Sequence, residues 1–376
     1  MQFETEILII GGGLAGLTAA LHLQKSNFNI TLIEKNTYPQ HKVCGEYISN
    51  EVLPYLAWLE ISFESLGPTS ISNLQLTSLS GASITTKLSM GGFGLSRYAM
   101  DYFLYQQLLK RNITVIYDTV TDVQFNNDVF NVKTTSGQSF TAGQVLGAFG
   151  KRSSVDVKLK RDFIQKKSPY IAVKAHYHGN FQSDLVGLHN FSGGYCGVSR
   201  VENEKLNICY LADYQSFRRY KNILNYQQEV IYKNRFLKDI LERSEMIFEM
   251  PLTIGQISFQ SKEPILDHIL MIGDTAGLIH PLCGNGMAMA MHSAKIASTL
   301  IVAFMRDKTC SRKEMEDNYA KLWNYNFRSR LRTGRILSSV LKNNTIQHIA
   351  LNTLTKMPQL LGKIVNMTHG KPIPIL

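Results

Sequence analysis

The N-terminal segment constrains the fold of this chain more than any other. Residues 7–10 are all apolar, and Gly11, Gly13 and Gly16 follow in a Gly-x-Gly-x-x-Gly pattern before a helical segment. A second apolar run ends at Glu34. Such glycines allow a tight turn, close approach of a pyrophosphate and close helix–strand packing, while the acid can bind a ribose. The helix N-terminus adds free N–H groups and a positive dipole end. The sequence therefore predicts an adenine-dinucleotide site, with NAD and FAD both open.

Length and charge limit the class of protein. A chain of 376 residues is too long for one small core, so we expect two domains. The formal net charge of +11 fits either a solvated basic surface or attraction to an anionic partner such as NADP, an acyl carrier protein or a membrane surface. No nucleic-acid-binding motif and no basic low-complexity tail is found, so no nucleic-acid partner is expected.

Cysteine usage and hydropathy indicate a cytoplasmic protein without a transmembrane segment. The five cysteines are far apart and form no Cys-x-x-Cys pair, which fits reduced thiols rather than disulfides or a zinc site. The chain enters its first strand without a signal peptide. No stretch reaches the roughly 18 uninterrupted apolar residues that span a bilayer. The best candidate, residues 286–305, is interrupted by His292, Ser293 and Lys295 and is predicted to be a buried helix.

Hydrophobic periodicity divides the chain into three parts. The predicted dinucleotide domain is discontinuous, and a sheet domain made from the inserts would supply the substrate wall. Residues 213–249 are predicted to be mostly helical. The predicted parts are 1–70, 97–165 and 262–305 for the dinucleotide domain, 71–96 and 166–261 for the substrate-binding sheet, and 306–376 for a C-terminal helical region.

Two further segments favour FAD. Asp274 follows a buried strand in Gly273-Asp274-Thr-Ala-Gly, where a carboxylate can bind the hydroxyls of a ribityl chain. The run Pro281-Leu-Cys-Gly284-Asn285-Gly286 opens a long helix, whose N-terminus can stabilise the negative charge of a reduced flavin. Arg97 begins another helix and could contact a phosphate or the flavin edge. Asp101 in the same helix either serves the helix dipole or is structural.

Together these motifs resemble the FAD-dependent group A monooxygenases, over roughly residues 1–310. The loop Lys42-Val-Cys44-Gly45-Glu46 is similar to that of the geranylgeranyl reductase branch of the same superfamily. The resemblance implies an α/β fold: a Rossmann-like FAD-binding domain of the glutathione-reductase type, an inserted β-sheet substrate domain and C-terminal helices. It also implies one FAD, reduced by NADPH or NADH that binds transiently.

The residues expected to serve the cofactor come from several distant segments. Cys44 and Glu46 are the catalytic candidates, although Cys44 is equally compatible with a small buried side chain. His176 and His178 have metal-like spacing without a third ligand, so no metal is expected. The predicted cofactor-binding residues are Gly11, Gly13, Leu14, Ala15, Gly16, Glu34, Lys35, Lys42, Cys44, Gly45, Arg97, Gly273, Asp274, Pro281, Gly284, Asn285, Gly286 and Met287.

Two departures from the resembled families bear on the substrate. Phe149 stands where those families usually have an acid, which suggests packing at that position. Tyr195 is kept from the aromatic motif of the prenyl reductases, while the following tryptophan and Phe-Pro are absent. A different substrate shape is therefore expected.

The prediction is an FAD-dependent oxidoreductase that uses NAD(P)H. A monooxygenase that hydroxylates an apolar or aromatic small molecule is slightly favoured. The alternatives left open are a reductase that saturates a carbon–carbon double bond and a non-catalytic flavin-binding scaffold or redox sensor. The substrate could be carried by a protein or be lipid-like. Arg328, Arg330, Arg332 and Arg335 could dock a carrier protein or lipid headgroups, or form a solvated helix face.

Overall fold

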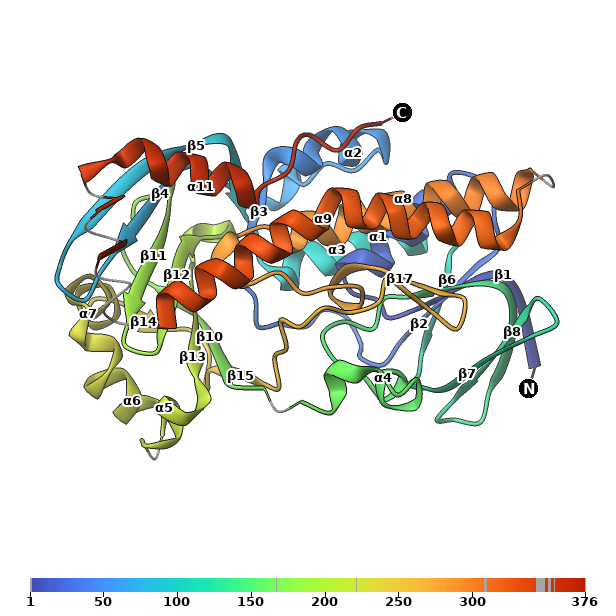
Figure 1. The fold of residues 1–376 in the computed structure, drawn as a ribbon, viewed down its shortest axis with the longest axis horizontal. Helices are drawn as coiled ribbons and strands as arrows, with labels where there is room; N and C mark the ends of the chain where they lie inside the picture. The colour runs from blue at the N-terminus through green and yellow to red at the C-terminus, as the bar shows by residue number, and fades with distance from the viewer. Residues whose placement is uncertain are drawn as a thin grey trace.

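The protein is built from two β-sheets that meet edge to face, with helices on their outer sides (Figure 1). A computed structural model describes residues 2–166, 168–220, 222–307, 310–342, 349–350, 353–354 and 356–375. The mixed α/β architecture confirms the predicted fold class.

The first sheet has a parallel centre, as expected for a dinucleotide-binding domain. β1 pairs in parallel with β2 on one side and β9 on the other, and β2 and β9 pair in parallel with β6 and β17. The hairpin of β7 and β8 joins β9 in antiparallel fashion. The strands are β1 (Gln2–Ile10), β2 (Ile30–Glu34), β6 (Thr114–Tyr117), β7 (Val120–Asn126), β8 (Val129–Thr134), β9 (Ser139–Gly147), β16 (Ile265–Leu266) and β17 (Ile269–Met271).

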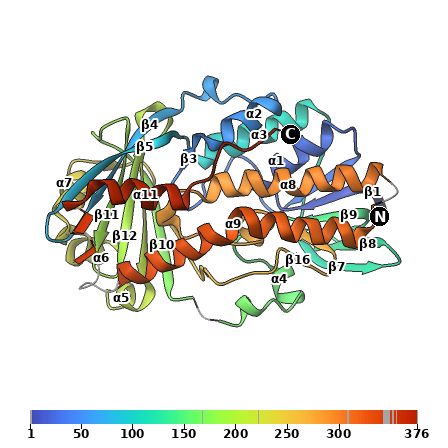
Figure 2. The same ribbon diagram turned by 45° about the horizontal axis from the view of Figure 1, so that its top comes forward.

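Helices α1 (Leu14–Gln24), α3 (Arg97–Lys110) and α8 (Gly286–Arg306) lie together on one side of the parallel strands, and α4 (Ser154–Lys158) lies on the other (Figures 1 and 2). The sequence explains the placement of α1, because nearly all its residues are small or apolar and ten of its eleven residues are buried. The apolar positions of β1, from Ile7 to Ile10, are likewise buried. The N-terminal ends of α1 and α8 therefore reach the carboxyl edge of the sheet, where ligands bind in such folds.

The second sheet is mostly antiparallel and forms the other half of the molecule. Its strand order is β14-β10-β13-β12-β11-β4-β5-β3, with β15 also paired to β10. Side chains alternate across it: Val173 and Cys196 enter a core beneath helices, while Ala172 and Tyr195 face the opposite way. The strands are β3 (Tyr47–Ser49), β4 (Thr69–Thr77), β5 (Ser83–Gly94), β10 (Tyr170–His178), β11 (Leu185–Phe191), β12 (Gly194–Arg200), β13 (Leu206–Asp213), β14 (Glu245–Met246) and β15 (Leu252–Gly255).

Two details differ from the sequence-based expectation. β3 lies within the part assigned to the dinucleotide domain, yet it pairs with β5 in the second sheet. Residues 245–246 are a strand rather than the end of a helical stretch, because they pair with Tyr177 and His178 at the end of β10. The division into domains itself stays a prediction. The helices of the 213–249 segment are α5 (Tyr214–Arg218), α6 (Ile223–Glu229) and α7 (Arg235–Glu242).

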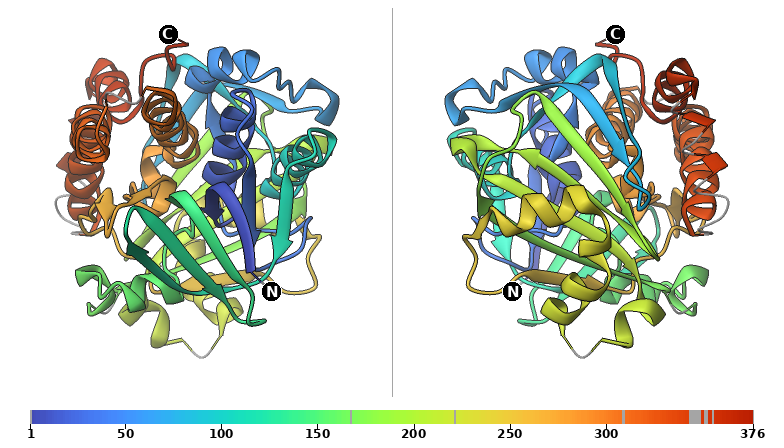
Figure 3. Two further views of the ribbon diagram at one scale, coloured as in Figure 1. Left: turned by 90° about the vertical axis from the view of Figure 1, so that its right-hand side faces the viewer. Right: turned by 90° about the vertical axis from the view of Figure 1, so that its left-hand side faces the viewer.

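The C-terminal helices run along one side of the molecule. α9 (Arg312–Lys342) packs outside α8, and α11 (Pro358–Thr368) packs on β5 of the second sheet (Figures 1 and 3). A short helix, α2 (Leu53–Trp58), lies near the end of the chain. By length and hydropathy α8 could cross a membrane, but two thirds of its apolar window (67%) is packed inside the molecule, as in the core helix of a folded domain.

Candidate cofactor and substrate site

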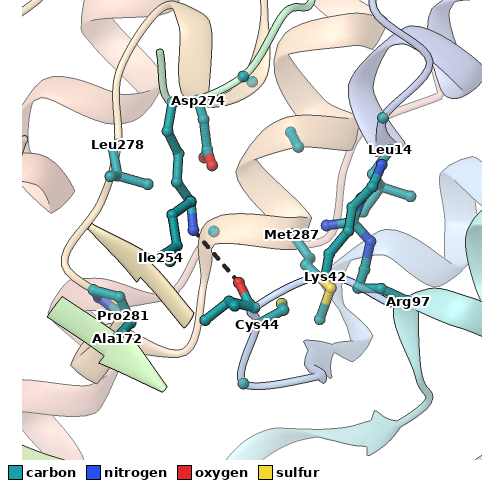
Figure 4. Close-up of a pocket in the computed structure, with 18 of the residues that line it drawn as sticks. Leu14, Lys42, Cys44, Arg97, Ala172, Ile254, Asp274, Leu278, Pro281 and Met287 are labelled. Atoms are coloured by element: carbon teal, nitrogen blue, oxygen red, sulfur yellow. Dashed lines mark hydrogen bonds between the residues drawn. The ribbon is translucent and has the colours of Figure 1, made fainter. Parts of the chain in front are cut away.

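A cavity of about 710 Å³ lies between the two sheets. The glycine turn after β1 and the start of α8 form one part of its wall, and strands β10 to β13 form another. Figure 4 shows Lys42 and Arg97 on one side of the cavity and the apolar residues Ala172 and Ile254 across from them, with Asp274 above Ile254.

The glycine turn is shaped by close backbone contacts. Gly11 has a φ of +106°, and a Cβ there would overlap the carbonyl of Ala148 at the end of β9. A Cβ at Gly16 would overlap the carbonyl of Gly11, so this glycine allows α1 to pack on the turn. Gly13 is different: a Cβ there would meet only the Arg97 Nη2 at 3.9 Å and the Lys42 Nζ at 4.0 Å. Gly13 therefore faces open cavity space beside two cations.

Those two cations are held in place by a buried carboxylate. Asp101 is fully buried, accepts two hydrogen bonds of 2.7 Å from the Arg97 guanidinium, and lies 3.1 Å from the Lys42 Nζ. Burial alone would raise the pKa of Asp101, but Arg97 and Lys42 outweigh it and lower the pKa. The structure thus gives Asp101 an organising role for two predicted cofactor contacts. Cations so placed can bind a pyrophosphate.

Two helix N-termini reach the cavity without a capping side chain. At α1 the N-cap residue is Gly13, and at α8 it is Asn285, whose side chain makes no capping hydrogen bond. The Asn285 amide instead donates to the Glu51 Oε1 at 2.5 Å and accepts from the Arg330 Nη1 at 3.1 Å. By contrast, the Ser96 hydroxyl caps α3. The unpaired N–H groups at the starts of α1 and α8 are therefore available to a ligand.

Arg330 corrects one expectation from the sequence. The four C-terminal arginines do not share one solvated stripe, because Arg330 is buried between α8 and Glu51, whereas Arg328, Arg332 and Arg335 are exposed. Burial raises the pKa of Glu51, and Arg330 and Asn285 offset part of that effect.

Two carboxylates lie where a dinucleotide needs acceptors. Glu34 accepts from the backbone N–H of Gly12 at 2.6 Å and of Asn36 at 3.1 Å, and it lines the cavity. Among the described residues the Asp274 carboxylate has no side-chain hydrogen bond, and in Figure 4 it points into the cavity. A carboxylate of this kind needs donors such as the hydroxyls of a ribityl chain. Uncapped helices, paired cations and a free acceptor together fit FAD.

Beneath the 42–46 loop, Glu46 is enclosed by three donors. It is fully buried, and its carboxylate accepts from the Lys174 Nζ at 2.5 Å, the His176 Nε2 at 2.7 Å and the Arg97 backbone N–H at 2.8 Å. Burial would raise the pKa of Glu46, but Lys174 and His176 outweigh it and lower the pKa. The side chain is thus an ionised anchor for the loop, and its catalytic role stays a prediction. The Lys174 Nζ also donates to the Lys42 carbonyl at 3.2 Å.

The cysteines near the cavity differ in their settings. Cys44 lines the cavity, and its carbonyl accepts from the Asn207 amide at 3.2 Å. Burial raises the pKa of both Cys209 and Cys283 to about 12, which keeps these thiols protonated near neutral pH. Cys44 is therefore the thiol best placed for a chemical role.

The structure brings the predicted residues together. Every predicted cofactor residue except Gly16 lines the cavity, as does Glu46, and their contacts with a cofactor stay predictions. The sequence did not single out Lys174 as a partner of Glu46 or Glu51 as a partner of Asn285. For the pairing of Lys174 with Glu46, the only signal in the sequence was that residues 172, 174 and 176 share one face of a strand. His176 contacts Glu46, and His178 is exposed.

Beyond the cofactor residues, the part of the cavity wall that the second sheet supplies is mostly apolar. It is formed by the face of the second sheet that lies opposite its own helical core, and α11 adds Val365, Thr368 and His369. Phe149 lines the cavity near the glycine turn, consistent with packing rather than polar chemistry at that position. The apolar residues on that face of the second sheet that line the cavity include Leu74, Leu88, Ala172, Val186, Leu188, Leu211 and Ile254.

Comparison with known proteins supports this view of the fold. Residues 6–63 match the family model described as FAD dependent oxidoreductase. The chain is 24% identical over 351 residues to conditioned medium factor receptor 1 of Dictyostelium discoideum, covering 85% of this chain and 67% of that protein. It is 22% identical over 334 residues to a digeranylgeranylglycerophospholipid reductase of Methanosarcina acetivorans (85% and 80%). An FAD-dependent monooxygenase of a Nectria species is 24% identical over 345 residues, covering 80% of this chain and 45% of that protein.

Solved structures share the architecture over nearly the whole chain. The flavin-dependent brominase Bmp2 superposes with a TM-score of 0.81 at 15% identity, covering 99% of this chain and 94% of its own. A geranylgeranyl bacteriochlorophyll reductase-like protein of Thermoplasma acidophilum gives 0.75 at 18% identity, covering 100% and 94%. These likenesses confirm the resemblance stated from the motifs.

Proposed function

The chain has the fold and the N-terminal motif of the FAD-dependent oxidoreductases, and from that premise we propose that it is a monooxygenase acting on an apolar small molecule. NADH or NADPH would reduce the bound FAD. One atom of oxygen would enter the substrate and the other would leave as water. The observation that carries the proposal is the apolar chamber of the second sheet, which is continuous with the cofactor residues in one cavity.

The chain's own residues would bind the cofactor along the cavity. Lys42 and Arg97, held by Asp101, face the open space beside Gly13 and suit a pyrophosphate. Asp274 suits the ribityl hydroxyls. The free N–H groups at Gly286 and Met287 suit the pyrimidine edge of the ring, where the helix dipole favours negative charge. When bound, FAD supplies the transfer of electrons from a nicotinamide to oxygen or to an organic substrate.

The wall of the chamber favours oxygen transfer over a reaction that needs a proton donor. Leu74, Leu188 and Leu211 can exclude water, which protects reactive oxygen chemistry from hydrolysis. Glu46, the carboxyl group of the 42–46 loop, is held ionised by Lys174 and His176. It is therefore poorly suited to giving a proton to a substrate carbon.

A reductase that saturates a carbon–carbon double bond is the second candidate. The position of Cys44 at the cavity favours it, since a thiol can donate the proton that follows hydride transfer. The digeranylgeranylglycerophospholipid reductases among the relatives point the same way. A protein that binds flavin without turnover remains the third alternative.

The reaction of the reduced protein with oxygen separates these candidates. The purified protein is reduced anaerobically with NADPH or NADH and mixed with aerated buffer, while flavin absorbance and hydrogen peroxide are followed. We expect rapid reoxidation with peroxide release when no substrate is present. Slow reoxidation in air would contradict the monooxygenase and favour the reductase. Failure of both nicotinamides to reduce the flavin would favour the scaffold.

Substitution of the cavity thiol provides the matched test. For a monooxygenase, Cys44→Ala should leave the rate of flavin reoxidation within about twofold of the wild type, since the substitution removes only a packing contact of the thiol. Cys310→Ala, a change at a free thiol outside the cavity lining, is the control. If Cys44→Ala alone abolished turnover while flavin reduction by NAD(P)H persisted, the reductase would replace the monooxygenase as the proposed function.

A further inference from the structure

The positive charge of this chain is concentrated at its C-terminal end. The last acidic residue is Asp317, and no aspartate or glutamate follows it in the remaining residues, 318–376. The formal net charge of the whole chain is +11, so this segment holds most of the excess. Its cations are Lys321, Arg328, Arg330, Arg332, Arg335, Lys342, Lys356, Lys363 and Lys371.

The outward face of α9 combines these cations with apolar side chains. Its inward residues, such as Trp323 and Phe327, are buried against the body of the protein. Tyr325, in contrast, is 85% exposed and Ile336 is 53% exposed. Between them on the same face lie exposed cations, since residues three or four apart on a helix are neighbours. These exposed cations are Lys321, Arg328, Arg332 and Arg335.

α11, which lies beside α9, also exposes both a cation and an apolar side chain. Figures 1 and 3 show the two helices next to each other on one side of the molecule, with α8 inside them. On α11 the exposed residues include Lys363 and Met367, one helical turn apart, and Met367 is 59% exposed. We call the exposed cations and apolar residues of α9 and α11 the C-terminal face.

We propose that the C-terminal face docks on an anionic lipid surface. From Lys321 onward, cations are interleaved with exposed apolar side chains and no acid follows Asp317. Such a surface matches a bilayer interface, where headgroups bind the cations and the apolar side chains enter the acyl boundary. An acidic carrier protein would need the cations but would gain little from Tyr325, Ile336 and Met367. A lipid surface is therefore the partner that contacts both the cations and the exposed apolar side chains.

The fold connects this face to the cavity. α11 contributes Val365 and Thr368 to the cavity wall and Met367 to the outside. Docking through α11 would thus bring the apolar chamber close to a lipid phase in which apolar compounds concentrate. The docking itself does not depend on the proposed reaction, and it can be tested without any turnover.

Vesicle sedimentation of the full chain tests the proposal. Vesicles of phosphatidylcholine containing phosphatidylglycerol are compared with vesicles of pure phosphatidylcholine, each at low and at high salt. We expect binding to the anionic vesicles that weakens as salt rises. Equal binding to both compositions, or none to either at low salt, would overturn the proposal. Binding of a purified acyl carrier protein at an affinity above that for the vesicles would also overturn it.

Two sets of variants identify the surface. Arg328→Gln, Arg332→Gln and Arg335→Gln together should weaken binding on the order of a hundredfold, since each cation near an anionic surface adds a comparable share. Tyr325→Ser with Ile336→Ser should lower the binding that persists at high salt. The control replaces three exposed cations elsewhere, Lys110, Lys133 and Lys158, by Gln. If the control lost as much affinity as the arginine triple, net charge rather than this face would be responsible.

Discussion

Glu46 illustrates how a single residue joins the two halves of the molecule. It lies in the loop before β3, and Lys174 and His176 reach it from β10 of the second sheet, more than a hundred residues later. The motif in the sequence placed Glu46 and Cys44 near the cofactor. It could not supply the partners of Glu46, because only the folded arrangement of β10 brings them to the loop. Buried charge in this setting is stable only while all of its partners are present.

The first prediction concerns this buried cluster. Glu46→Gln leaves the Lys174 ammonium buried without its counter-charge, so it should lower the free energy of unfolding by about 3–5 kcal/mol. The pKa of Glu46 is lowered in the folded protein. Its stabilisation is therefore present above the ordinary carboxyl pKa of 4.5 and is lost as the pH falls through the lower folded value. Urea titrations across pH should show the gap between wild type and variant narrowing in acid.

A double variant makes this prediction sharper. Glu46→Gln with Lys174→Met removes both charges, so it should be more stable than Glu46→Gln alone. A double variant no more stable than the single variant, or a gap that does not change with pH, would show that the ion pair is not what stabilises the loop.

At the scale of elements, the sequence predicted most helices and strands because their periodicity is strong. The predicted helix that begins at Arg97 coincides with α3, and the buried helix predicted at residues 286–305 coincides with α8. The pairing of β3 and β14 could not be predicted, since strands of two or three residues carry no periodic signal and depend on a neighbouring edge. The burial of Arg330 could not be predicted either, because it depends on contacts with Glu51 and Asn285 from other elements.

The start of α1 yields a prediction that separates folding from ligand binding. A side chain at Gly13 would enter the cavity and meet no close protein atom, whereas one at Gly11 would overlap the backbone of Ala148. Gly13→Val should therefore keep the melting temperature of the cofactor-free protein while weakening FAD binding by more than tenfold. Gly11→Ala should lower that melting temperature, since it combines an overlap with a positive φ.

The test compares the effects of the Gly13 and Gly11 substitutions on stability and on FAD binding. Thermal unfolding of the cofactor-free forms and flavin fluorescence titrations measure the two effects separately. A Gly13→Val protein that unfolds as easily as Gly11→Ala would mean that Gly13 serves the fold. A Gly13→Val protein that binds FAD with the affinity of the wild type would mean that the cofactor does not bind beside Gly13.

At the scale of the whole molecule, the cavity exists because the carboxyl edge of the first sheet meets one face of the second sheet. The first sheet contributes the carboxyl edge that follows the glycine motif, and the second contributes an apolar face left free by its own helices. The first contribution was predictable from residues 7–34 and 273–287. The second was predictable only as an apolar wall, since the residues that meet there come from strands and a helix spread over most of the chain.

Calorimetric titration of the cofactor-free protein with FAD tests the central claim most directly. The account predicts one FAD per chain. Binding should be weakened more than tenfold in Gly13→Val and on the order of tenfold in Asp274→Ala, which removes the charge-assisted hydrogen bonds of the carboxylate. Both variants should unfold at the temperature of the wild-type cofactor-free protein. The absence of FAD binding to the wild type, or binding that neither substitution affects, would contradict the account.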